Sequence, residues 1–318
     1  ILTGSTTVDE ENIEHSGAGR ISRLMMRTLS LFESGDSNGA ISLKELFNKP
    51  GDISGISSKT IADVAKLIVR GGWPNSIGKK EEITRRQIAG YCDVIAKSEI
   101  KTIDGVQRDE EKTKAILRSF SRHISTRTPN STILKDILSN NETLHKNTLD
   151  AYITALKKLY VIEDLTAWSP KLRSKTTIRT SDTRHFVDPA IAAFYLGANS
   201  KDLIYDPETF GLLFESMVIR DLRVYTQCLG GTVYHYKDKD GLEADAIIHL
   251  NDGRWGAFEV KLGAKWIDEA AKNLLALKSK IDDSHMNPPS FLGVITATEF
   301  AYKREDGILV VPLCCLRD

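Results

Sequence analysis

Two short motifs, Glu243-Ala-Asp245 and Glu259-Val-Lys261, most restrict how this chain can fold. Apolar and polar residues alternate through both segments, and the turn sequence Asn251-Asp252-Gly253 separates them, so they predict a β-hairpin. Because side chains alternate between the two faces of a strand, the charged residues of each motif are predicted to share one face. The opposite, core-facing side is predicted to carry Leu242, Ala244, Ala246, Ile248, Phe258, Val260 and Leu262.

Glu215 adds another acidic position on a predicted helix at residues 207–230, whose apolar residues recur at helical spacing. Carboxylates that lie together repel one another unless a cation or a proton neutralises them. Carboxylate oxygens are ligands that suit Mg²⁺ or Mn²⁺, and a lysine ammonium beside them can orient an attacking water. The sequence therefore predicts a metal site where the helix and the hairpin meet.

The order of the predicted elements points the same way. The helix at 207–230 is followed by a strand at 232–236, the hairpin, a helix at 267–281 and strands at 291–296 and 308–313. Glu215 lies on the helix, Glu243-Ala-Asp245 on one strand of the hairpin and Glu259-Val-Lys261 on the other. This arrangement resembles that of the PD-(D/E)XK superfamily, which has a restriction-endonuclease-like α-β-β-β-α-β core. The resemblance covers residues 206–318 and implies a metal-dependent nuclease.

The resemblance also implies roles for individual residues. Lys261 would orient the attacking water and act in catalysis with Asp245 and Glu259, and Glu243 would be available for a second metal. The implied metal ligands are Glu215, Asp245, Glu259 and the backbone carbonyl of Val260.

A structural role is the alternative for the same residues. Glu215 is flanked by apolar side chains on its predicted helix, so it could form an ion pair with Lys261 that holds the hairpin to the helix. Asp221 is a further acid on that helix which the motif does not use. We expect it to pair with a nearby arginine or lysine.

Composition sets the wider limits. The chain has 318 residues, enough for two or three domains, and its 43 basic and 43 acidic residues leave a net charge of zero. No global basic field therefore attracts nucleic acid, and any surface for DNA must be local. The four cysteines lack metal-ligand spacing, which is typical of a reduced cytoplasmic protein. No long apolar run indicates a membrane span.

The first residues show a different pattern. Ile1-Leu-Thr-Gly-Ser5 and the later Gly19-Arg-Ile21 resemble the second half of an AAA-type P-loop ATPase core. The resemblance implies that Thr3 or Ser5 senses a nucleotide and that Arg20 is a sensor or finger arginine. No G-x-x-x-x-G-K-[S/T] motif is present, so ATP binding is expected only in a longer protein. Residues 1–75 are predicted to be the end of the ATPase core and its lid.

The middle of the chain is predicted to be helical. Residues 76–120 are expected to form a helical connector, and residues 121–205 a winged helix, from two helices followed by two strand-like segments. The segment between these strands is basic and could contact DNA phosphates or only be solvated. Its basic residues include Lys171, Arg173, Lys175 and Arg179.

Taken together, the motifs resemble prokaryotic AAA-type ATPases with a C-terminal DUF4143 domain. They include Gly71-Gly-Trp-Pro74 and Phe186-Val-Asp188-Pro189 as well as the acidic motifs. The expected protein is an α/β multidomain chain: a remnant of an ATPase core, a winged helix and a nuclease-like domain. Its expected partners are DNA and, through an arginine finger, further copies of itself. The hypotheses left open are a metal-dependent nuclease, a catalytically inactive DNA-binding platform and a protein-interaction module.

Overall fold

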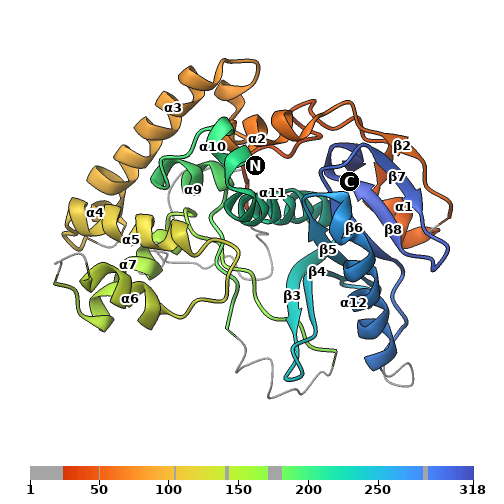
Figure 1. The fold of residues 1–318 in the computed structure, drawn as a ribbon. Helices are drawn as coiled ribbons and strands as arrows, with labels where there is room; N and C mark the ends of the chain where they lie inside the picture. The colour runs from red at the N-terminus through yellow and green to blue at the C-terminus, as the bar shows by residue number, and fades with distance from the viewer. Residues whose placement is uncertain (1–23, 50, 104, 140–142, 171–180, 282–285) are drawn as a thin grey trace.

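The protein is a mixed α/β molecule with a helical N-terminal region and a seven-stranded mixed sheet. The computed structural model describes residues 24–49, 51–103, 105–139, 143–170, 181–281 and 286–318. Figure 1 shows most of the helices gathered on one side and the sheet on the other, with helix α11 (Pro207–Cys228) between them. None of the described helices is long and apolar enough to cross a membrane.

Helices of the N-terminal region begin at capping residues. Thr60 and Asp63 form a capping box at the start of α2, and Asp109 and Asp188 cap α5 and α9 through backbone N–H groups. The helices are α1 (Leu43–Asn48), α2 (Ile61–Arg70), α3 (Glu81–Val94), α4 (Ile100–Thr102), α5 (Glu110–Arg122), α6 (Asn130–Leu138), α7 (Lys146–Lys158), α9 (Pro189–Tyr195) and α10 (Ser200–Tyr205). After α7, two isolated antiparallel bridges join Ile162 to Phe186 and Leu165 to Thr183.

The sheet has the strand order β2-β7-β8-β6-β5-β4-β3. The pairs β5–β6 and β6–β8 are parallel and the others are antiparallel. The strands are β2 (Gly55–Ile56), β3 (Gly231–Lys237), β4 (Glu243–Leu250), β5 (Trp255–Lys261), β6 (Leu292–Thr296), β7 (Phe300–Lys303) and β8 (Leu309–Pro312). From α11 onward, helix, three strands, helix and strand follow in the order that the sequence predicted.

Both faces of the sheet are covered. Phe258 and Val260 of β5 pack in the same core cluster as Phe214 and Met217 of α11. Trp255 and Ala257, at the alternate positions of β5, pack in a second cluster with α12 (Ile267–Lys280). The strands therefore need apolar residues on both sides, as in sheets that are covered by helices on each face.

Strand β4 departs from the predicted alternation. Between the pairs Tyr234–Ile247 and Tyr236–Ala244, β3 has one residue and β4 has two, which defines a β-bulge in β4. The prediction that Leu242, Ala244, Ala246 and Ile248 share one side is therefore wrong. Leu242 and Ala244 pack with the cluster of α12, whereas Ala246 and Ile248 pack with that of α11.

An early segment of the chain completes the C-terminal sheet. Strand β2 pairs with β7, and β1 (Ile41–Ser42) pairs in parallel with β9 (Leu316–Arg317). Ser42 also caps α1 by accepting the N–H of Glu45. The sequence did not predict β1, β2, β7 or β9, because strands of two to four residues are too short to carry a clear periodic signal.

Candidate functional site

Three elements bring the predicted site residues together. Helix α11 supplies Glu215, β4 supplies Asp245 and β5 supplies Glu259 and Lys261. The Nζ atom of Lys261 lies 2.7 Å from Oε2 of Glu259 and 3.7 Å from Oδ2 of Asp245. The same Asp245 oxygen accepts a hydrogen bond from the N–H of Val260 at 2.7 Å. We call Glu215, Asp245, Glu259 and Lys261 the acidic cluster.

Several pKa values in the acidic cluster are shifted from their ordinary values. Burial, followed by the neighbouring Asp245 carboxylate, raises the pKa of Glu259 to about 8. The same two causes raise the pKa of Glu215 well above its ordinary value. Burial would lower the pKa of Lys261, but Asp245 and Glu259 outweigh it and raise that pKa. The carboxyl groups of Glu215 and Glu259 thus hold their protons more tightly than ordinary glutamates do, because burial and the neighbouring carboxylate disfavour their charged forms.

Glu243 lies in different surroundings. Its carboxylate accepts hydrogen bonds from Arg127 at 2.7 and 2.8 Å, and it also pairs with Lys237. Burial would raise the pKa of Glu243, but the hydrogen bonds from Lys237 and Arg127 lower it below its ordinary value. The β-bulge explains why Glu243 and Asp245 have different partners.

Arg127 is a residue that the sequence did not single out. It lies between α5 and α6 and brings a cation from the helical region to Glu243, and its charge also acts on Glu215. No motif marks Arg127, since it follows Ser125-Thr126 in an ordinary loop sequence. Only the tertiary packing reveals its place.

The side chains of the acidic cluster are of the type that binds a hard divalent cation, but they are only partly in position to hold one. Buried carboxylates that repel one another are the ligands that Mg²⁺ or Mn²⁺ would neutralise. However, the part of the chain that the structure describes contains no group of three or more His, Cys, Asp or Glu side chains placed to hold a metal ion. The Lys261 ammonium lies against Glu259 and Asp245, so a cation there would require the lysine to move.

A second charged cluster lies further along α11, formed by Asp188, Arg220 and Asp221; we call it the clamp. Arg220 binds Asp221 at 2.7 Å and Asp188 at 3.1 Å, which confirms the predicted partner for Asp221. Asp188 also accepts the N–H of Gly72 at 2.9 Å, so the Gly-Gly-Trp-Pro and Phe-Val-Asp-Pro motifs meet here. A side chain at Gly71 would collide with Trp73 and Asp188, and its φ of +69° favours glycine.

Two sets of predicted site residues lie outside the described residues. They are the nucleotide-sensing residues Thr3, Ser5 and Arg20, and the basic residues Lys171, Arg173, Lys175 and Arg179. Both sets remain predictions.

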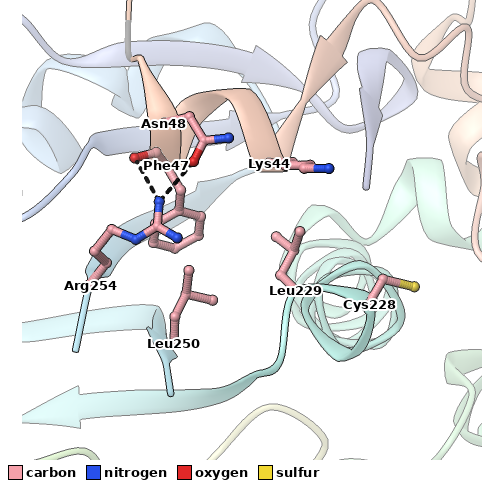
Figure 2. A pocket seen from close by; sticks show the side chains of 7 residues that line it. All are labelled: Lys44, Phe47, Asn48, Cys228, Leu229, Leu250 and Arg254. Carbon is pink, nitrogen blue, oxygen red and sulfur yellow. Dashed lines mark hydrogen bonds between the residues drawn. The ribbon is translucent and has the colours of Figure 1, made fainter. Parts of the chain in front are cut away.

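A pocket of about 240 Å³ lies at the other end of β4 from the acidic cluster. Figure 2 shows its walls, in which Arg254 donates hydrogen bonds to the side chain of Asn48 at 2.8 Å and to the carbonyl of Phe47 at 3.4 Å. Arg254 also pairs with Asp252, so one of the two cations that line this pocket is already neutralised. The remaining lining residues are Lys44, Cys228, Leu229 and Leu250.

Two family models match the chain. Residues 61–202 match a domain of unknown function (DUF8612), and residues 210–316 match a domain of unknown function (DUF4143). The acidic cluster lies entirely within the DUF4143 match, as the resemblance in the sequence implied, whereas Arg127 and Asp188 lie within the DUF8612 match. Neither model is that of an AAA-type ATPase. No curated protein matches the chain.

Proposed function

We propose that the acidic cluster hydrolyses phosphodiester bonds in nucleic acid with the help of Mg²⁺ or Mn²⁺. The observation that supports this best is the excess of acid: Asp245 and Glu259 contact one ammonium, and Glu215 from a third element interacts electrostatically with all three groups. Perturbed pKa values caused by burial and like charges are typical of functional sites.

Each residue of the cluster has a distinct role in this proposal. Asp245 and Glu259, with Glu215 and the carbonyl of Val260, would hold the cation, which would supply charge neutralisation at the phosphate and a more acidic water. Lys261 would move from Glu259 to the scissile phosphate or the attacking water. The raised pKa of Lys261 keeps its ammonium charged for that role.

A cleavage assay with matched variants tests the proposal. Labelled single-stranded, duplex and branched DNA and RNA are incubated with the protein in Mg²⁺, Mn²⁺ or EDTA. We expect Mn²⁺-dependent cleavage that falls at least about 100-fold in Glu259→Gln and Lys261→Met. Asp252→Asn is the control, because this exposed acid lies in the β4–β5 turn and pairs with Arg254. Cleavage that survives both site variants would assign it to a contaminating enzyme.

A second candidate is a catalytically inactive domain that binds DNA or another protein. The observation that favours it is the close contact of Lys261 with Glu259, which can act as a structural ion pair between neighbouring positions of β5. Titration calorimetry separates the two candidates. Binding of Mn²⁺ that is lost in Glu259→Gln supports the nuclease, whereas no binding at millimolar Mn²⁺ supports the inactive domain.

A role for ATP stays a prediction from the sequence. Thr3, Ser5 and Arg20 would contribute only to a nucleotide site whose phosphate-binding loop lies in another part of a longer protein or in another subunit. We infer that ATP would regulate the acidic cluster from a distance. The described residues would not bind it.

A further inference from the structure

Two exposed aromatic residues lie near the carboxyl ends of strands β5 and β6; we call this end of the sheet the carboxyl edge. Trp266 lies in the connection from β5 to α12 and is 50% exposed, and Phe300 begins β7 and is 53% exposed. The two connections touch, since the N–H of Ala297 donates to the carbonyl of Leu262 at 3.3 Å. Lys261 is the last residue of β5, so the acidic cluster lies at the same edge.

Lys265 adds a cation to this surface. Its Nζ atom lies 4.8 Å from the centre of the Trp266 ring, and within the described residues it forms no ion pair. Trp266 follows Lys261 by five positions, and five residues of chain span at most about 18 Å. Trp266 therefore lies within a few nucleotides of any phosphate that reaches Lys261.

The acids nearby limit how strongly this edge can attract phosphate. Asp268 and Glu269 lie in the first turn of α12, and Glu299 is exposed between β6 and β7. Arg304 neutralises Asp268 at 2.6 Å, but Glu269 and Glu299 keep their charges on the surface. Contact between a base and an aromatic ring suits such a surface better than a row of phosphate contacts, because stacking depends little on charge.

We propose that Trp266, with Lys265 over one face of its ring, is a stacking platform whose other face takes an unpaired base of single-stranded nucleic acid. The platform holds the nucleic-acid strand so that it runs along the carboxyl edge of the sheet into the acidic cluster. This inference rests on the proposed function and specifies its substrate as single-stranded. A base in a duplex is already stacked on its neighbours, so it does not offer its face to Trp266.

Binding measured without metal tests the platform separately from cleavage. Fluorescence anisotropy in EDTA compares a labelled 12-nucleotide oligo-dT with a 12-base-pair duplex. We expect Trp266→Ala to weaken binding of the single strand roughly 5- to 100-fold and Trp266→Phe to retain most of it. Tyr205→Ala is the matched control, because Tyr205 is 86% exposed on α10 and away from this edge. Binding should also depend only weakly on salt.

The outcomes distinguish the two proposals. Loss of single-strand binding in Trp266→Ala but not in Trp266→Phe or Tyr205→Ala supports the platform, even if no DNA is cleaved in Mn²⁺. Unchanged single-strand binding in Trp266→Ala overturns the platform, even if Glu259-dependent cleavage is observed. An equal loss of duplex and single-strand binding also overturns it, since a stacking platform would not act on paired bases.

Discussion

Helix α11 takes part in two charged clusters that differ in how their charges are satisfied. In the clamp, Arg220 lies between Asp188 and Asp221, and backbone N–H groups of Gly72 and Leu31 complete the hydrogen bonding. In the acidic cluster, roughly one and a half turns earlier on the helix, Asp245 and Glu259 share the ammonium of Lys261, whose charge also acts on Glu215. The clamp is fully buried and its carboxylates accept hydrogen bonds from backbone N–H groups as well as from Arg220, whereas the Lys261 ammonium of the acidic cluster is partly exposed and burial raises the pKa of Glu215 and Glu259.

The difference indicates what each cluster is for. A buried charge that is hydrogen-bonded to several elements fixes the positions of those elements. Here the clamp joins α11 to α9 and to the segment at Gly72. An excess of acid does not stabilise a fold by itself, and it becomes useful when a cation or a proton is bound. Variants that remove single charges test this contrast.

The largest effect is expected at the clamp. Arg220→Met should lower the free energy of unfolding by about 3–5 kcal/mol, because it leaves Asp188 and Asp221 buried without their cation. Urea denaturation measures this change. Arg86→Met, which removes an arginine whose side chain on α3 is 77% exposed, is the control and should leave the midpoint near that of the wild type. A clamp variant as stable as this control would refute the structural role.

A smaller loss is expected at the acidic cluster. Lys261→Met should lower the free energy of unfolding by about 2 kcal/mol in EDTA, since the side chain of Lys261 is 27% exposed and its carboxylates can take up protons. Millimolar Mg²⁺ or Mn²⁺ should restore stability to this variant and should not restore it to Arg220→Met. Equal responses of the two variants to metal would remove the distinction between the clusters.

The pH dependence of stability provides a third comparison. The pKa of Glu259 is about 8 in the folded protein against an ordinary value of 4.5, so the folded state binds a proton that the unfolded state releases between these values. Stability should therefore fall as the pH rises from about 4.5 to about 8. Thermal unfolding at several pH values, with Glu259→Gln as the reference, measures this loss. Parallel curves for the two proteins would show that Glu259 is ionised throughout.

The smallest effect is expected for Glu243. Its carboxylate is partly exposed and pairs with Arg127 and Lys237, so Glu243→Gln should change the free energy of unfolding by less than about 1 kcal/mol. Mn²⁺ binding by calorimetry should be unchanged if Glu243 lies outside the cation site. A clear loss of one binding equivalent would instead support a second metal at Glu243.

The hairpin and its flanking helices could be predicted because their signals are local. Alternating residues and the Asn-Asp-Gly turn predicted β4 and β5, and the apolar spacing predicted α11, which ends at Cys228, two residues before the predicted end. Asp221 was expected to pair with a basic residue, and Arg220 is that residue. These features depend on neighbours in the sequence.

The rest depends on contacts between distant segments. The β-bulge at Asp245 and Ala246 follows from the pairing of β4 with β3, and simple alternation cannot show it. The approach of Arg127 to Glu243 joins residues from two different family matches. The prediction that the hairpin keeps one polar face also missed the second core cluster, because α12 covers that side of the sheet.

The pairing of β1 with β9 and of β2 with β7 bears on the order in which the molecule folds. Ile41 pairs with Leu316, so the two partners are separated by most of the described chain. Contacts of such high sequence separation form slowly, since a long loop must close before they stabilise anything. During synthesis, the segment at residues 41–56 leaves the ribosome long before the strands with which it pairs. We therefore expect β1 and β2 to pair with β9 and β7 last. Until β2 is paired, the edge of β7 is open to pairing with other chains.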